Sequence, residues 1–207
     1  FAVEELQGDR EIVMAAVAND GKALQYASFD LTKDREVVLQ AVANRGGALE
    51  FVDESLKSPS GSGPEIVGTA VAQDGRALQF ASALLQRNRN IVLAAVKNNG
   101  RALEFAATEL KGDSKIALAA VAQHGGALTF IKSSDQNREL VLTAIRNQGD
   151  IGGQALQYAA REFRSDKEVV LAAVKEWGRA LQHASPALRD DRDVVLAAVL
   201  QDPDAMR

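Results

Sequence analysis

The sequence of 207 residues contains no cysteine, only two histidines and four prolines, and 5% aromatic residues. The absence of cysteine excludes disulfides, thiolate metal sites and cysteine nucleophiles. No stretch of the chain approaches the roughly 18 consecutive apolar residues of a membrane-spanning helix. With 46% hydrophobic and 25% charged residues, the composition is that of a folded chain rather than a disordered one. A net charge of -4 leaves no surplus of cations for binding a polyanion.

One nine-residue pattern, of which DREVVLQAV from Asp34 is an example, recurs eight times along the chain. The copies begin at Asp9, Asp34, Gly63, Asn88, Asp113, Asn137, Asp166 and Asp191. Between them a second block recurs seven times, as in GKALQYAS from Gly21. A unit of about 25 residues cannot bury its own apolar faces, so we expect successive units to stack on one another.

Each unit carries signals for two helices joined by a turn. Asp or Asn opens seven of the eight copies and suits the N-cap of a first helix. About eleven residues later a glycine recurs, and we expect it to end this helix in the left-handed conformation. These glycines are Gly21, Gly46, Gly75, Gly100, Gly125 and Gly178. An Ala-Leu pair that follows, such as Ala23-Leu24, is predicted to begin the second helix.

The pattern predicts an all-α fold, specifically an α-solenoid of stacked two-helix repeats. The first helix is apolar on nearly every side and has an alanine column unbroken in all eight copies, which requires close neighbours. We expect one continuous array over 1–207, with a partial unit at 1–8, units starting near 9, 34, 63, 88, 113, 137 and 166, and a partial unit at 191–207. Inserts near 58–63 and 150–153 are predicted to be loops on an edge of the stack, either as tolerated insertions or as binding elements. Because no capping unit is visible, we expect a longer array or ends covered by another component.

The recurring pattern DREVVLAAV…GxALxFAS resembles tandem short helical repeats catalogued only as a domain of unknown function. This resemblance covers nearly the whole chain and implies a repeat scaffold without a particular activity. The sequence departs from the pattern at Gly63-Pro64, where other units begin with Asp-Arg, and at His183, which stands in a column of Phe and Tyr.

No constellation of residues points to catalysis. His124 and His183 stand in different columns, and neither belongs to a spacing that holds zinc. The segment Gly61-Ser62-Gly63 lacks the lysine and the preceding strand of a phosphate loop. We therefore predict a protein that is not an enzyme and that holds no metal or cofactor.

Two polar columns lie beside the turn glycine. Two residues before it stand Asn19, Asn44, Gln73, Asn98, Gln123, Asn147 and Glu176, which we expect to bond open helix-end carbonyls or to stack as a ladder. The residue directly before the glycine varies, and variation within a regular repeat is where partner specificity would be encoded. This candidate partner-binding edge comprises Asp20, Arg45, Asp74, Asn99, His124, Gln148 and Trp177. Trp177 either anchors a partner or packs against the neighbouring unit.

A basic row follows the N-cap positions and comprises Arg10, Arg35, Arg89, Arg138, Lys167 and Arg192. Acids beside these cations predict ion pairs at the surface, and the alternative is an anion-binding stripe.

Three functions remain open on this sequence. The leading hypothesis is a non-catalytic scaffold for protein–protein binding or for the assembly of a larger complex. The first alternative is nucleic-acid or anion binding along the basic row, against which the net acidity argues. The second is a module that positions an activity located elsewhere in a larger protein.

Overall fold

The computed structural model describes residues 4–147 and 153–206, and within these ranges all regular structure is helical, which confirms the predicted all-α fold. The chain divides into two compact units, Phe1–Leu110 and Lys111–Arg207. The prediction of one continuous array depends on the junction between them and stays a prediction. Gln148 and most of the insert at 150–153 lie outside the described residues.

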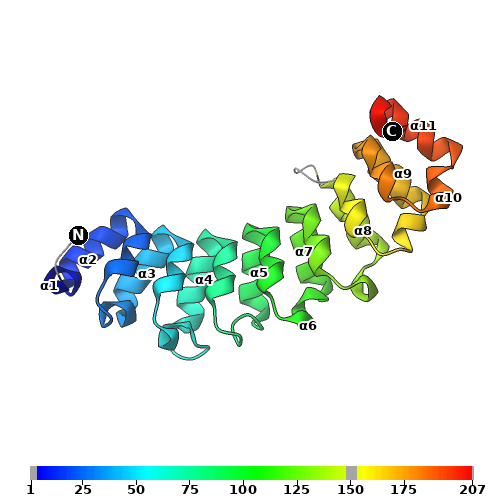
Figure 1. Ribbon diagram of the computed structural model, residues 1–207. Coiled ribbons are helices and arrows are strands. Elements are labelled where there is room, and N and C mark those ends of the chain that lie inside the picture. The colour runs from blue at the N-terminus through cyan, green and yellow to red at the C-terminus, as the bar shows by residue number, and fades with distance from the viewer. Residues whose placement is uncertain (1–3, 148–152, 207) are drawn as a thin grey trace. The chain divides into compact units, whose positions relative to one another are not determined.

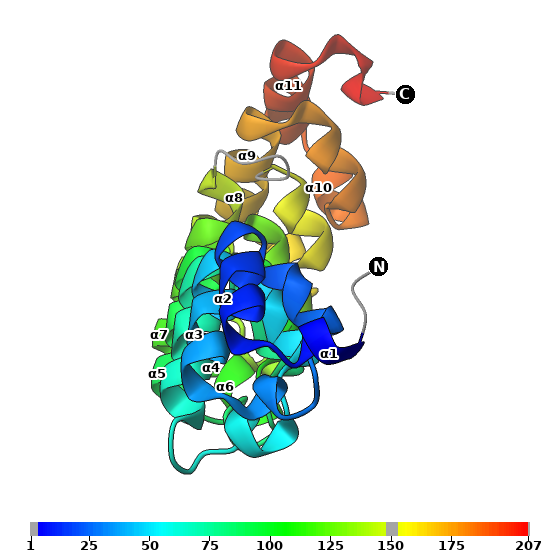
Figure 2. The same cartoon turned by 90° about the vertical axis from the view of Figure 1, so that its left-hand side faces the viewer.

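The first unit alternates α-helices with 3-10 helices (η). In chain order these are α1 (Glu4–Gln7), α2 (Arg10–Asn19), η1 (Gly21–Tyr26), η2 (Leu31–Lys33), α3 (Arg35–Asn44), η3 (Gly46–Phe51), η4 (Glu54–Lys57), α4 (Gly63–Gln73), η5 (Gly75–Phe80), α5 (Arg89–Asn98), η6 (Gly100–Phe105) and α6 (Thr108–Lys111). Figure 1 shows α2, α3, α4 and α5 side by side in chain order, and each contacts the next. Figure 2 looks along this row with α2 in front.

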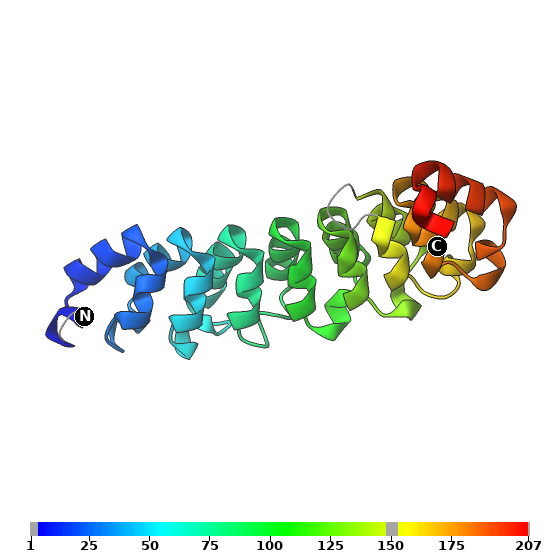
Figure 3. The ribbon, with the colours of Figure 1, turned by 45° about the horizontal axis from the view of Figure 1, so that its top comes forward.

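The second unit repeats the same alternation. Its elements are α7 (Ser114–Gln123), η7 (Gly125–Phe130), η8 (Ser133–Asp135), α8 (Arg138–Arg146), η9 (Gly153–Tyr158), η10 (Phe163–Ser165), α9 (Lys167–Glu176), η11 (Gly178–His183), α10 (Pro186–Arg189), α11 (Arg192–Gln201) and η12 (Pro203–Met206). Here α7 contacts α8, α8 contacts α9, and α9 contacts α11. Each unit is thus a stack of hairpins of one α-helix and one η helix, and Figure 3 shows those of the first unit one after another.

The α-helices begin where the N-cap pattern predicts. At α3, Asp34 Oδ1 accepts hydrogen bonds from the backbone N–H groups of Glu36 (2.9 Å) and Val37 (3.0 Å), which satisfies two donors of the first turn. Helices α2, α5, α7, α9 and α11 begin in the same way. Helix α4 begins differently, because Ser62 makes no capping bond and Pro64 in the first turn removes one N–H that would need a partner.

The second helix of each hairpin is a 3-10 helix, so its prediction as an ordinary helix was incomplete. In η5 the bonds run between residues three apart, from Ala77 N to Asp74 O (2.9 Å) and from Ala81 N to Leu78 O (3.1 Å). Gly75, Leu78 and Ala81 are all buried. A 3-10 helix has three residues per turn and places these three on one face. In the sequence, this 3-10 helix was indicated by glycine, leucine and alanine recurring at intervals of three residues.

The turn glycines do not adopt the predicted left-handed conformation. Among the described glycines only Gly61, in the insert at 58–63, has a positive φ, of 60°. A residue in extended conformation makes the turn instead, such as Asp74 with φ -141° and ψ 109°. Glycine is required for space, because a β-carbon on Gly75 would lie 2.3 Å from the carbonyl oxygen of Ala95 on α5. The corresponding gap is 2.2 to 2.5 Å at Gly21, Gly46, Gly125 and Gly178.

The core lies between successive hairpins, as the alanine column predicted. On α3, Val37, Val38, Ala41 and Val42 are all fully buried, because this helix contacts α2 and α4 as well as η1 and η3. Side chains on both flanks of one helix are therefore covered by the hairpins before and after it.

We predict that Gly75→Ala destabilises the protein by about 1 to 3 kcal/mol, because its β-carbon has no room against the Ala95 carbonyl. Gly47→Ala is the matched control, since nothing lies within 4 Å of a β-carbon there. Chemical denaturation measures both. Equal midpoints for the two variants would contradict the close approach as the reason for the glycine.

We predict that Leu128→Ala costs about 2 to 5 kcal/mol of folding free energy, because Leu128 is fully buried in η7, which contacts α7 and α8. Leu84→Ala serves as the control, because Leu84 is 59% exposed. The same denaturation experiment tests the pair. A loss below about 0.5 kcal/mol at Leu128 would be the size of an ordinary surface change and would show that the leucine column is not the core.

Candidate functional site

Members of the amide column bridge adjacent hairpins, and at Asn44, Asn98 and Asn147 this confirms the predicted bonding of helix-end carbonyls. Asn44 Nδ2 donates to Ala18 O (2.9 Å), in the last turn of α2, and Asn44 Oδ1 accepts from Gly21 N (2.8 Å). One side chain thus holds both sides of the preceding turn. Asn98 bonds Ala72 O (2.8 Å) and Gly75 N (2.7 Å) in the same way.

The second unit uses the same amide bridge. Gln201 Oε1 accepts from Gly178 N (2.5 Å), and Gln201 Nε2 donates to Glu176 O (3.4 Å). Asn147 Nδ2 donates to Ala122 O (2.5 Å). These amides are therefore part of the structure between hairpins.

Sequence reasoning missed two buried polar side chains, Lys57 and Gln136. Gln136 Nε2 donates to Ile131 O (3.3 Å) and Tyr158 O (3.2 Å), and its Oε1 accepts from Ala160 N (2.8 Å), so it joins adjacent hairpins. Lys57 Nζ bonds Glu54 Oε1 (2.9 Å) and Glu50 O (3.4 Å). Gln136 stands directly before the N-cap Asn137, whereas Lys57 stands before the insert at 58–63, so their distance from the start of the next repeat did not mark them.

The candidate edge combines capping with variable side chains. Asp20, Asp74 and Asn99 each accept a bond from the backbone N–H two residues later, at 2.9, 2.9 and 3.0 Å, and so cap η1, η5 and η6. Arg45 makes no cap and pairs with Asp20 (Nε to Oδ1, 3.0 Å). His124 and Trp177 make no side-chain cap either. We call the described members of this column the turn edge: Asp20, Arg45, Asp74 and Asn99 in the first unit, and His124 and Trp177 in the second.

Trp177 packs on its own hairpin. Its ring stacks on that of His183, with centroids 6.2 Å apart and an interplanar angle of 29°. Partial burial and the nearby charge of Arg164 lower the pKa of His183, so its ring stays neutral to lower pH than a solvated histidine. His183 therefore replaces Phe or Tyr in its column as a partly buried, uncharged ring, while Trp177 keeps part of its surface exposed.

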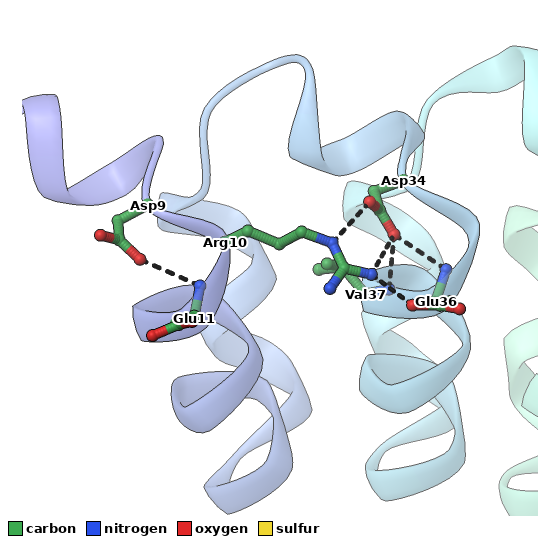
Figure 4. Close-up of polar contacts among 6 residues, drawn as sticks. All are labelled: Asp9, Arg10, Glu11, Asp34, Glu36 and Val37. Atoms are coloured by element: carbon green, nitrogen blue, oxygen red, sulfur yellow. Dashed lines mark hydrogen bonds and ion pairs between the residues drawn. The ribbon is translucent and has the colours of Figure 1, made fainter.

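The basic row forms ion pairs with acids of the following hairpin. Figure 4 shows Arg10 between Asp34 and Glu36, with Arg10 Nε 3.0 Å from Asp34 Oδ2 and a second guanidinium nitrogen bonded to Glu36. Lys167 repeats this arrangement with Asp191 (2.9 Å) and Asp193 (2.8 Å).

Other cations of the basic row also pair with acids of the following hairpin. Arg138 bonds Asp166 (3.2 Å) and Glu168, and Arg35 bonds Glu65 (2.6 Å). The predicted surface pairing is therefore confirmed for Arg10, Arg35, Arg138 and Lys167. In each case the acids belong to the next hairpin along the chain. Nucleic-acid binding along the row stays a prediction.

These pairs shift the ionisation of the N-cap acids. The guanidinium of Arg10 and then the backbone N–H of Val37 lower the pKa of Asp34, and the ammonium of Lys167 likewise lowers the pKa of Asp191. A carboxylate whose pKa is lowered by folding stabilises the fold above its unfolded pKa, and this contribution is lost as the pH falls through the folded value.

Among residues 4–147 and 153–206, no three His, Asp or Glu side chains come together as metal ligands. Over the same residues, no helix has the length and hydropathy of a transmembrane segment.

Comparison with known proteins identifies one family. Its description is "Domain of unknown function (DUF4116)", and its model matches residues 1–33, 9–57, 64–111, 88–136, 137–189 and 166–207. The chain belongs to this family. A single DUF4116 match can cover two successive hairpins, as 9–57 does from α2 to η4, so one match includes an interface between hairpins. No curated protein and no solved structure matches the chain.

We predict that Asp34→Asn reduces the loss of stability between about pH 6 and pH 3, because an asparagine can still cap α3 but has no pKa to be lowered. Urea midpoints at the two pH values measure this difference. Asp30→Asn is the control, since Asp30 is exposed and forms no ion pair among residues 4–147 and 153–206. An acid loss as large in Asp34→Asn as in the native chain would contradict a role for the Arg10 pair.

Proposed function

We propose that this chain is a non-catalytic helical-repeat scaffold that binds another protein along the turn edge. The observation that carries the proposal is a constant backbone with changing side chains. All six described turn-edge residues have φ between -152° and -141° and ψ between 105° and 114°. At this one geometry the side chain is in turn an acid, a guanidinium, an acid, an amide, an imidazole and an indole.

The packing of the hairpins supports this choice of surface. The columns on either side of the turn edge are occupied by the bridging amides and by glycines in contact with the next helix. A change in those columns would disturb the stack. The turn-edge side chains are less constrained, since Arg45 and Asp20 remain 56% and 47% exposed. A repeat can therefore vary its binding chemistry there without losing its neighbours.

The charge distribution supports a protein rather than a nucleic acid as the partner. Four cations of the basic row are already paired with acids, so fewer of them are available to neutralise phosphates and release the counterions condensed on a nucleic acid. The first-unit turn edge mixes both signs of charge, which suits polar contacts at the rim of a protein interface. An aromatic side chain such as Trp177 is typical of the centre of such an interface.

We predict that Arg45→Glu in the first unit and Trp177→Ala in the second each weaken retention of a bound protein. The immobilised chain would be used to enrich partners, which are quantified by mass spectrometry and then purified for titration. We expect at least one variant to lower the affinity of the purified partner by about tenfold, the loss of one good interfacial contact.

Arg161→Glu is the matched control, because Arg161 is an exposed cation on the connector after η9. Circular dichroism checks that all three variants keep their helicity. Equal binding by native chain, Arg45→Glu and Trp177→Ala would exclude the turn edge as the binding surface.

A further inference from the structure

Three unusual residues of the second unit lie together at η11. Trp177 is the only tryptophan of the chain, and His183 replaces the Phe or Tyr of its column. A 3-10 helix has three residues per turn, so Trp177, directly before η11, shares one face with Ala180 and His183. Their two rings stack along this face. With Arg164 of η10 they form a group that we call the donor cluster.

Arg164 lies beside His183. The backbone N–H of Ser185, two residues after His183, donates a hydrogen bond to Arg164 O (2.8 Å). The positive charge of Arg164 also contributes to the lowered pKa of His183, after the larger effect of burial. Arg164, Trp177 and His183 are all partly exposed. The cluster is therefore within reach of a ligand from solution.

The place of Arg164 in its hairpin is elsewhere filled by a side chain that bonds backbone carbonyls. Counted as the fifth residue after the one that ends each η helix, it corresponds to Lys57, Gln86 and Gln136. Gln86 Nε2 donates to Leu78 O (3.1 Å), and Lys57 and Gln136 also donate to carbonyls. In contrast, Arg164 Nε is buried and has no hydrogen-bond partner among the described residues.

The donor cluster presents hydrogen-bond donors that the described chain does not use. A guanidinium and an indole carry only donors, and a neutral imidazole carries one N–H and one acceptor nitrogen. Over residues 4–147 and 153–206, the rings of Trp177 and His183 make no hydrogen bond, and no carboxylate pairs with Arg164. A buried donor without a partner costs free energy, which an acceptor would recover. The ligand that suits the cluster is therefore an anionic acceptor.

The accessibility of the cluster is that of an ordinary hairpin of the stack. Helix η11 contacts η9 of the preceding hairpin and also α11 and η12. The aromatic residues at the position of His183 in other hairpins are partly exposed as well, namely Phe51, Phe80, Phe105, Phe130 and Tyr158. What distinguishes this hairpin is the chemistry of its side chains.

We infer that the donor cluster is a binding site for a carboxylate, supplied by an aspartate or glutamate side chain of a partner protein. The guanidinium of Arg164 pairs with the carboxylate, and the ring N–H groups of Trp177 and His183 add donors. A carboxylate suits the cluster better than a phosphate, because the cluster holds one positive charge and a phosphate monoester carries nearly two negative ones. The inference stands even if the turn edge of the first unit binds nothing.

The test titrates the full chain with a single capped amino acid. N-acetylglutamate N-methylamide is the probe, and the corresponding glutamine derivative is its uncharged match. Both are added at pH 7 and constant ionic strength. NMR follows the ring resonances of Trp177 and His183, and Trp177, as the only tryptophan, also reports by fluorescence. We expect saturable changes at millimolar glutamate derivative, and at least about tenfold weaker binding of the glutamine derivative.

Arg164→Gln is the decisive variant, because glutamine stands at this position at Gln86 and Gln136 and is therefore compatible with the fold. We expect it to weaken binding of the glutamate derivative by at least about tenfold. Arg161→Gln is the matched control, since Arg161 is an exposed cation just before η10, and it should bind as the native chain does.

His183→Phe provides a second variant if Arg164→Gln alters the fold. It restores the aromatic residue of the column and removes only the imidazole, so we expect binding to weaken about threefold while helicity is kept. No saturable change in the native chain, or equal affinity in the native chain and in both variants, would overturn the inference. Binding of capped phosphoserine more than about tenfold tighter than capped glutamate would show that the carboxylate assignment is wrong.

Discussion

The stack depends on the close approach of each glycine turn to the backbone of the next α-helix. A β-carbon would lie 2.2 to 2.5 Å from the alanine carbonyl at five described positions, so the glycine cannot be replaced by a residue with a side chain. The glycine N–H is then directed at an amide from the same helix, which also bonds the end of the preceding helix. Packing and hydrogen bonding thus hold the same pair of hairpins at the same place, which explains why glycine and amide recur together.

Because of this contact, the two ends of an α-helix and its buried sides have different structural roles. The start of a helix such as α3 carries its cap and an ion pair with the adjacent hairpin, whereas its end carries the bridge and the turn edge. Side chains that face a neighbour are apolar and buried. The described turn-edge residues share a fixed backbone conformation and none of them is buried, and they are therefore where differences between repeats are tolerated.

The repeat, the helix starts and the buried columns follow from the sequence because they rest on local or periodic signals. The Asp34 side chain caps the α3 backbone that directly follows it, and Leu128 lies in a column of identical leucines, so no distant residue is needed to predict either. The prediction that the turn glycine is left-handed was wrong because its conformation depends on a residue of another hairpin. Glycine serves both positive φ and close approach, and only the position of the Ala95 carbonyl distinguishes them at Gly75. The 3-10 helix was missed because an Ala-Leu pair fits either kind of helix.

By itself, the sequence determined an all-α stack of short hairpins, its N-caps, its core and its membership of a repeat family, because these are encoded within one unit and repeated. The tertiary structure decided which unit each polar side chain bonds: that Asn44 reaches back to Ala18 and Gly21, and that Arg10 reaches forward to Asp34. It also decided that Trp177 stacks on His183. Spacing along a chain gives the order of the contacts, but the distance between two atoms of different hairpins exists only once the hairpins are packed.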